Sequence, residues 1–244
     1  MKIYVISLKE SNDRRKEISK RMQELGLEFE FFDAVDGRQG LPKEYESMVD
    51  RNLTKKRYGV MSDGEYACAL SHALLYKKIV EEKVEHAIIL EDDVIIENDF
   101  SIMIQEKALE KSKKDFMFLY HLHTSKLFWG KKKFMYGYDM IKIARQSKSA
   151  CGYYINNKVA SYMAENSFPI SYVADWSVNI MHFNTGAICP RIVHHPPLVN
   201  SFLENNRVKK STTFGQFGFW CWFIYKLKKP FIKKIYKDVN KYEK

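Results

Sequence analysis

The sequence has 244 residues, with 40 Lys and Arg against 30 Asp and Glu, and therefore a formal net charge of +10. This length suits one domain with a short appendage, and 45% hydrophobic residues exclude wholesale disorder. Only 11 Gly and 6 Pro exclude fibrous and Gly/Pro-rich classes. The four cysteines lie far apart with no C-x-x-C pair, which argues against a disulfide framework or a structural zinc site and favours a reducing compartment.

The positive charge is concentrated at the end of the chain. Residues 207–244 carry 11 Lys and Arg against 2 Asp and Glu, a net of +9, whereas residues 1–206 carry 29 against 28. We therefore expect a nearly neutral domain over 1–206 and a basic tail over 207–244. The apolar run at residues 3–8 is too short for a signal peptide, and no run of about 18 apolar residues predicts a membrane span.

The first third of the chain predicts a β-α-β unit, which builds a parallel sheet. Residues 3–8 form an apolar strand, a helix is expected to about residue 25, and residues 28–35 form a second strand. Residues 38–60 are polar and irregular, and we expect a surface excursion there. Ser62 and Glu65 have the spacing of a capping box, which starts a helix reaching about residue 82.

The remaining elements complete an α/β fold, a mixed sheet flanked by helices. Strands are expected at 87–90, 116–120 and 150–155, and helices at 99–111 and 156–165. We also expect a loop or a hairpin within 121–149, a short helix that Asp175 starts or precedes, and an extended segment over 188–199. No repeat of fixed period is present, which argues against solenoids and propellers.

Three consecutive carboxylates, Glu91, Asp92 and Asp93, follow the apolar strand at 87–90. Ligands of open α/β sheets bind beyond the carboxyl ends of strands, and adjacent carboxylates repel one another unless a cation or donors relieve them. Oxygen ligands suit Mg²⁺ or Mn²⁺. Side chains alternate along an extended chain, so Glu91 and Asp93 are expected to point one way and Asp92 the other. The alternative is an acidic surface loop.

Three blocks together resemble glycosyltransferase family 25. The first is Ile6-Ser7-Leu8 with Arg14-Arg15 and then Phe31–Gly37, the second is Gly64–His72 (G-E-Y-A-C-A-L-S-H), and the third is Leu90–Val94 (L-E-D-D-V). The resemblance implies a GT-A-type Rossmann-like fold and an inverting transfer of a hexose, typically galactose, from a UDP-sugar to a lipooligosaccharide or lipopolysaccharide acceptor. It also implies that Asp93 binds the Mn²⁺ or Mg²⁺ cofactor, Glu91 the ribose and Asp92 the donor sugar.

The same resemblance places uridine at the ends of the first two strands. It nominates as donor-binding residues Ser7, Leu8, Arg14, Ala34 and Asp36. Arg14 suits a diphosphate as a bidentate donor, and its alternative is a solvated helix charge. Glu65 and Ser71 are further donor-binding candidates on the helix after the capping box, although Glu65 also suits a purely capping role. On the same helix, Cys68 is expected to be a small core residue rather than a nucleophile.

Asp175 is the candidate catalytic base, because inverting transfer needs a group that takes the proton of the acceptor hydroxyl. Trp176 beside it suits stacking on the acceptor sugar, or alternatively a place in the core. His195 is a candidate second metal ligand, and the alternative is a structural or exposed histidine. His121 and His123 suit either a metal pair or, as we favour, loop positions near the acceptor.

The tail interleaves aromatic residues with lysines. Apolar residues recur at steps of three and four, a helical stripe formed by Trp220, Phe223, Leu227, Phe231 and Ile235. Such a helix suits an anionic membrane surface, although Pro230 interrupts it. We therefore expect a cytoplasmic enzyme, peripheral on the inner face of the cytoplasmic membrane. The alternative is a terminal helix packed on the domain.

Two other functions remain open at this point. One is a nucleic-acid-binding protein or nuclease, which the neutral body over 1–206 argues against because a polynucleotide track needs basic residues near the site. The other is a catalytically inactive membrane-surface adaptor of the same fold. The intact carboxylates Glu91, Asp92, Asp93 and Asp175 argue against the adaptor.

Overall fold

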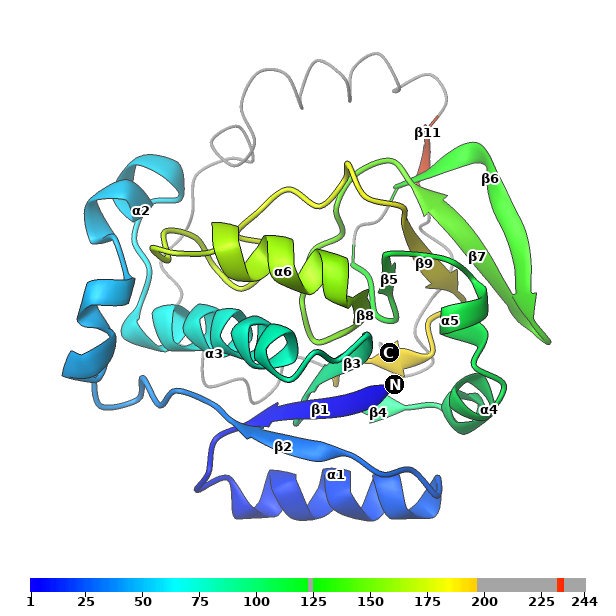
Figure 1. The fold of residues 1–244 in the computed structure, drawn as a ribbon, viewed down its shortest axis with the longest axis horizontal. Coiled ribbons are helices and arrows are strands. Elements are labelled where there is room, and N and C mark those ends of the chain that lie inside the picture. Colours follow the sequence, from blue (N-terminus) through cyan, green and yellow to red (C-terminus); the bar gives the residue numbers. More distant parts are fainter. Residues whose placement is uncertain (123–124, 197–231, 235–244) are drawn as a thin grey trace.

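A nine-stranded mixed sheet organises the protein, and helices cover both of its faces (Figure 1). The structure is a computed structural model that describes residues 1–122, 125–196 and 232–234. The strand order is β11-β6-β7-β9-β5-β8-β3-β1-β2, and β10 and β4 form a separate two-stranded sheet. The strands are β1 (Lys2–Ser7), β2 (Glu30–Asp33), β3 (His86–Glu91), β4 (Ile95–Ile96), β5 (Phe116–Phe118), β6 (Ser125–Met135), β7 (Tyr138–Ile143), β8 (Gly152–Asn156), β9 (Thr185–Cys189), β10 (Val193–His194) and β11 (Ile232–Lys234).

The helices divide between the two faces of the sheet. They are α1 (Asn12–Glu24), the 3-10 helix η1 (Lys43–Met48), α2 (Arg51–Arg57), α3 (Asp63–Glu81), α4 (Asp99–Gln105), α5 (Ala108–Lys111) and α6 (Asn157–Asn166). Figure 1 shows α3 and α6 on one side of the sheet and α1 on the other. The core follows this division, because one apolar cluster joins the sheet to α1 and α4 and a second joins it to α3 and α6.

The predicted β-α-β opening is confirmed. β1 pairs in parallel with β2 on one side and with β3 on the other. The apolar run of β1 is buried on both faces, since Val5 lies in the α1 cluster and Tyr4 in the α3 cluster. The mixed α/β sheet with flanking helices is therefore the fold, and the carboxyl ends of three parallel strands meet at one edge.

The capping box of α3 is also confirmed. The Ser62 hydroxyl accepts a hydrogen bond from the Glu65 backbone N–H at 3.3 Å, and the Glu65 carboxylate accepts one from the Ser62 N–H at 2.9 Å. The loop after β2 passes very close to the start of α3. A Cβ on Gly37 would lie 2.5 Å from the Asp63 carbonyl oxygen, so only glycine fits there.

Four local predictions differ from the structure. The excursion over 38–60 contains η1 and α2, and Asp50 caps α2 by accepting a hydrogen bond from the Leu53 N–H at 2.7 Å. The helix predicted over 99–111 is divided into α4 and α5 by Lys107, whose φ is +51°. No helix begins at Asp175. Within the predicted tail helix, residues 232–234 form β11, paired with β6, because Pro230 disfavours helix and the edge of β6 offers free backbone groups.

The rest of the tail lies outside the described residues. Within the ranges 1–122 and 125–196, no helix combines the length and the apolar composition needed to cross a bilayer.

Candidate active site

The acidic triplet lies at the edge where the parallel strands end. Glu91 is the last residue of β3, and its backbone N–H donates to the Cys151 carbonyl at 2.9 Å, which continues the pairing toward β8. Asp92 and Asp93 follow directly. Because β1 and β2 run parallel to β3, their carboxyl ends lie beside the triplet. This is the position at which open α/β sheets bind ligands.

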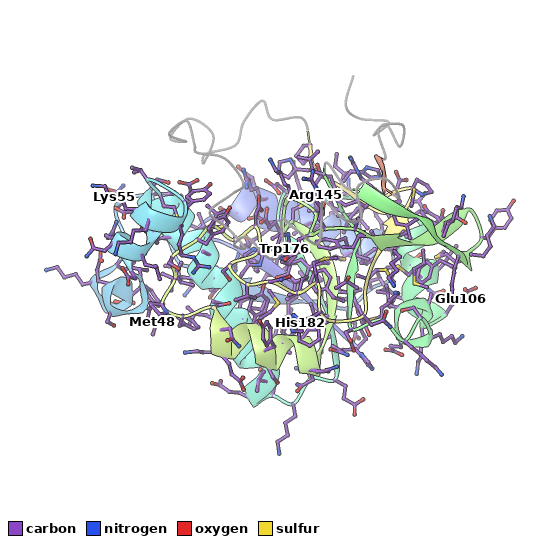
Figure 2. All side chains as sticks on the ribbon, turned by 90° about the horizontal axis from the view of Figure 1, so that it is seen from above. Met48, Lys55, Glu106, Arg145, Trp176 and His182 are labelled. Atoms are coloured by element: carbon purple, nitrogen blue, oxygen red, sulfur yellow. The ribbon has the colours of Figure 1, made fainter. Side chains whose placement is uncertain are left out.

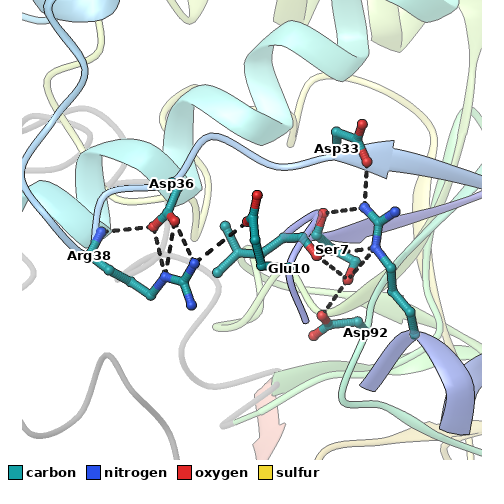
Figure 3. A network of polar contacts seen from close by, with 8 residues as sticks. Ser7, Glu10, Asp33, Asp36, Arg38 and Asp92 are labelled. Atoms are coloured by element: carbon teal, nitrogen blue, oxygen red, sulfur yellow. Dashed lines mark hydrogen bonds and ion pairs between the residues drawn. The ribbon is translucent and has the colours of Figure 1, made fainter. Parts of the chain in front are cut away.

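Asp92 is held against the end of β1. The Ser7 hydroxyl donates to Asp92 Oδ2 at 2.7 Å, and Figure 3 shows this bond. Arg14 at the start of α1 donates to Asp92 Oδ1 from Nη1 at 3.1 Å. The same Nη1 lies 3.5 Å from Asp93 Oδ2. One guanidinium therefore offsets part of the repulsion between two neighbouring carboxylates.

Asp93 is the least satisfied carboxylate of the triplet. Its Oδ1 is buried and makes no hydrogen bond, while Oδ2 lies 3.7 Å from His195 Nε2. Burial and the charge of Glu91 raise the pKa of Asp93 to about 6. For Glu91, burial also opposes ionisation, but the contact with His72 and the charges of His195 and Arg14 outweigh it, so the pKa of Glu91 lies below its usual value. An unsatisfied buried oxygen at this position needs a donor or a cation.

Glu91, Asp93 and His195 form a group with the chemistry of a metal site. One ligand atom from each lies within 4.8 Å of the others. Two carboxylates and an imidazole suit Mn²⁺, and carboxylates also suit Mg²⁺. The buried, unsatisfied Asp93 Oδ1 shows that these residues fit a metal ion, because a bound cation would give this oxygen the partner that it lacks. Asp92 is outside this group, in agreement with the alternation expected from the sequence.

Arg15 connects the ends of β1 and β2 beside the triplet. It donates to the Ser7 carbonyl at 3.0 Å and the Leu8 carbonyl at 3.1 Å, and it also contacts the Asp33 carboxylate. The Ala34 N–H donates to the Ser7 carbonyl at 2.9 Å, which extends the pairing of β1 and β2 by one residue. These contacts fix the backbone of Ser7 and Leu8 beside the acidic triplet.

Asp36 lies next along the same edge and belongs to a surface ion pair (Figure 3). Arg38 Nη2 donates to Asp36 Oδ2 at 2.6 Å and lies 3.6 Å from the Glu10 carboxylate. The hydrogen bonds from Arg38 lower the pKa of Asp36. Asp36 is therefore an ionised acceptor already engaged by a guanidinium, and a ligand there would meet the pair rather than a single carboxylate.

Comparison with known proteins identifies the family of this chain. The model of glycosyltransferase family 25 (LPS biosynthesis protein) matches residues 1–178. The chain belongs to glycosyltransferase family 25. The matched range includes the whole acidic triplet and Asp175, and it ends before His195.

Several curated proteins are similar to this family member. It is 27% identical to the lipooligosaccharide biosynthesis protein lic2B of Haemophilus influenzae over 74% of this chain and 69% of that protein. It is 31% identical to a putative glycosyltransferase of the same species over 74% and 64%. It is 32% identical to the lacto-N-neotetraose biosynthesis glycosyltransferase LgtE of Neisseria meningitidis over 51% and 44%. The matched part thus spans less than two thirds of the length of the putative glycosyltransferase and of LgtE.

Two of the predicted donor-binding residues, Ser71 and Glu65, are buried. Ser71 is fully buried, accepts a hydrogen bond from the Val35 N–H at 2.9 Å and donates to the Ala67 carbonyl at 2.7 Å. Glu65 is 4% exposed and serves the capping box. Both side chains therefore support the loop after β2 and the start of α3. The capping alternative is confirmed for Glu65, and donor contact by the two side chains stays a prediction.

Asp175 and Trp176, although adjacent in the sequence, differ in burial. Trp176 is buried at the centre of the molecule (Figure 2), edge-on to the rings of Phe116, Phe118 and Tyr153. Stacking on an acceptor sugar is therefore excluded for Trp176, and the core alternative is confirmed. Asp175 is only partly buried. Burial raises the pKa of the Cys151 thiol, and the charges of Glu91, Asp93 and, least of the three, Asp175 raise it further.

His72 is a site residue to which the sequence assigned no role, although it belongs to the Gly64–His72 block. Its Nε2 lies 3.5 Å from Glu91 Oε1, and its Nδ1 shares a hydrogen bond of 2.8 Å with the Tyr153 hydroxyl. The spacing of Cys68 and His72 on one helical face was the available signal. Of the other predicted histidines, His121 is buried with Nε2 3.0 Å from the Ile188 carbonyl oxygen. His123 lies outside the described residues.

Proposed function

We propose that this protein is an inverting, metal-dependent hexosyltransferase with a GT-A-type site. It moves a hexose, galactose by family resemblance, from a UDP-sugar to a sugar of a lipooligosaccharide or lipopolysaccharide acceptor. Membership of glycosyltransferase family 25 supports the reaction class. The relatives named for lipooligosaccharide and lacto-N-neotetraose biosynthesis support an oligosaccharide acceptor.

The observation that carries the proposal is the acidic triplet at the carboxyl end of β3, with Asp93 Oδ1 buried and unsatisfied. Asp93 and His195 would hold Mn²⁺ or Mg²⁺, Glu91 would contact the ribose and Asp92 the donor sugar. When bound, the ion neutralises negative charge on the departing UDP. Asp92 is already held by the Ser7 hydroxyl, so the donor sugar meets a carboxylate of fixed direction.

The ends of β1 and β2 supply the remaining donor contacts in this proposal. Ser7, Leu8, Ala34 and Asp36 line the backbone edge next to the triplet, as expected for a uridine-binding strand end. Arg14 is positioned to exchange its contacts with Asp92 and Asp93 for the diphosphate, which binds a guanidinium in a bidentate manner.

Asp175 is the proposed general base. It takes the proton of the acceptor hydroxyl as that oxygen attacks the anomeric carbon from the face opposite UDP. Its partial exposure leaves it reachable by an acceptor.

The direct test is a donor panel with the full-length chain, Mn²⁺ and a truncated lipooligosaccharide acceptor. We expect UDP-galactose to support transfer and removal of divalent metal to abolish it. UDP with Mn²⁺ is also expected to raise the melting temperature of the protein. No transfer from any UDP-hexose, together with no stabilisation by UDP, would refute the proposal and favour an inactive adaptor.

For the tail over 207–244 we propose contact with an anionic membrane surface at the inner face of the cytoplasmic membrane. Its net charge of +9 and its interleaved aromatic residues support this location. Deleting the residues after 213 is expected to release the protein from vesicles that contain phosphatidylglycerol. Binding of the truncated protein at the level of the full chain would refute the anchor. Neutral phosphatidylcholine vesicles are the control, because they lack the anionic attraction.

A further inference from the structure

A second cluster of metal-ligand type lies behind the acidic triplet. One ligand atom each from Cys68, His72 and Glu91 lies within 4.8 Å of the other two. Cys68 and His72 are four residues apart on α3, so their side chains share one face of that helix. Glu91 meets them from the end of β3. The cluster thus joins the helix to the strand that carries the acidic triplet.

His72 has the environment of a metal-binding histidine. Its Nδ1 is 2.8 Å from the Tyr153 hydroxyl, which is 2.7 Å from the Tyr76 hydroxyl, and all three side chains are buried. Its Nε2 is buried without a hydrogen bond and lies 3.5 Å from Glu91 Oε1. In metal sites the second ring nitrogen is commonly fixed by such an outer hydrogen bond, which leaves the first nitrogen free to bind the ion.

We propose that Cys68, His72 and Glu91 form a Zn²⁺ site. A thiolate, an imidazole and a carboxylate are the ligand types that zinc takes, and the thiolate selects against Mn²⁺ and Mg²⁺. Zinc bonds of about 2.1 Å in a tetrahedron place ligand atoms about 3.4 Å apart, close to the 3.5 Å between His72 Nε2 and Glu91 Oε1. Three protein ligands leave one position for water.

An ion can reach this site because two of its ligands are accessible. His72 is 2% exposed, but the Glu91 side chain is 28% exposed and Cys68 is only partly buried. Zinc therefore enters past Cys68 and Glu91 and reaches Nε2 of His72, whose ring is already oriented. No rearrangement of the Tyr76–Tyr153–His72 hydrogen bonds is needed.

Glu91 belongs to both ligand groups, which gives zinc binding a consequence. A Glu91 carboxylate bound to Zn²⁺ is withdrawn from the group it forms with Asp93 and His195 and from the donor. Zinc is therefore expected to inhibit Mn²⁺-supported transfer. This consequence rests on the proposed function, whereas zinc binding itself does not.

The binding test uses the full-length, metal-free chain and Co²⁺ as a spectroscopic substitute for Zn²⁺. We expect an absorption band from thiolate-to-cobalt charge transfer, which added Zn²⁺ bleaches at one equivalent. Cys68→Ser is expected to remove the band and weaken Zn²⁺ binding by about 100-fold, and Tyr153→Phe to weaken it by about tenfold. Cys189→Ser is the matched control and keeps the band. A band that persists in Cys68→Ser, or no Zn²⁺ binding by the wild-type chain, would overturn the site.

The activity test measures the Zn²⁺ concentration that halves Mn²⁺-supported transfer. It is expected to rise at least about tenfold in Cys68→Ser and to stay unchanged in Cys189→Ser. Equal inhibition of both variants would show that zinc acts elsewhere, for example at Asp93 and His195, and would overturn the inhibitory role. If no variant transfers sugar with Mn²⁺, the proposed function fails, but the cobalt spectrum still decides the zinc site.

Discussion

Ser7 at the end of β1 and Asp92 after β3 are joined by a hydrogen bond of 2.7 Å between Ser7 Oγ and Asp92 Oδ2. The two residues are 85 positions apart in the sequence, and Ser7 is 2% exposed. A hydroxyl that donates to an ionised carboxylate in a mostly buried place fixes the direction of that carboxylate. The hydrogen bond to the end of β1 therefore restricts rotation of the Asp92 side chain.

Ser7→Ala tests this relationship. Removing the hydroxyl leaves Asp92 with the Arg14 contact at 3.1 Å, so the position of its carboxylate becomes less defined. We expect kcat for transfer to fall about tenfold and the free energy of unfolding to fall by about 1 kcal/mol. Steady-state kinetics and urea unfolding measure the two effects. Ser7→Thr keeps a hydroxyl and is expected to recover most of the activity, and failure to do so would argue for packing rather than hydrogen bonding.

Asp93→Asn tests the proposed metal ligand. An amide keeps the shape of the side chain but loses the charge that a divalent cation requires. Transfer is expected to fall by about 100-fold or more, because metal stabilisation of developing charge is worth several kcal/mol. Asp139→Asn is the matched control, since Asp139 pairs with Lys131 and Lys133 on the β6–β7 hairpin. Normal Mn²⁺-supported transfer by folded Asp93→Asn would exclude Asp93 as the ligand.

Asp93→Asn, which is expected to lower activity, is expected to raise the stability of the metal-free protein. Burial and the charge of Glu91 raise the pKa of Asp93 from 3.8 to about 6. Ionised Asp93 therefore destabilises the folded state above about pH 6, and this cost disappears below its unfolded pKa near 4. With the side chain 21% exposed, Asp93→Asn should add about 1–2 kcal/mol at about pH 8 and nothing near pH 4. Urea unfolding in EDTA measures this, and an equal difference at both pH values would contradict it.

The local patterns of the sequence predicted the half of the fold that carries the site. The β-α-β opening, the capping box of α3 and the strand before the acidic triplet each follow from periodicity or from a side chain that acts within four residues. Alternation along the extended chain also anticipated that Asp92 lies apart from Glu91 and Asp93. Such predictions succeed because the interactions that decide them are short in sequence.

The features that the sequence did not predict depend on distant partners. β8 lies between β3 and β5 and runs antiparallel to both, an order that no local pattern encodes. The contact of His72 with Glu91 is long-range as well, and so is the burial of Trp176 among rings from β5 and β8. Helix α2 was missed because its residues are mostly polar and its start depends on the Asp50 cap.

Trp176 gives a prediction that distinguishes core packing from acceptor binding. Its indole is 1% exposed and contacts three aromatic rings with centroids 5.1 Å away. Trp176→Phe removes part of this packing and is expected to lower the free energy of unfolding by about 1–3 kcal/mol. The KM for the acceptor should stay unchanged in the folded variant. A raised acceptor KM at unchanged stability would instead return Trp176 to the acceptor site.

Asp175→Asn tests the proposed base. The amide cannot take a proton from the acceptor hydroxyl, so kcat is expected to fall by about 100- to 10,000-fold, the range usual for general-base catalysis. Binding of UDP with Mn²⁺, measured by calorimetry, should remain within about twofold because Asp175 is not proposed to touch the donor.

Glu165→Gln on the exposed surface of α6 is the control for removing one carboxylate, and it is expected to leave kcat unchanged. Near-normal turnover by Asp175→Asn would move the base elsewhere. A loss of UDP binding as large as the loss of kcat would also contradict the role, because it would mean that Asp175 acts by organising the donor site. The combination of retained UDP binding and lost turnover is therefore the result expected for a group that acts on the acceptor and not on the nucleotide.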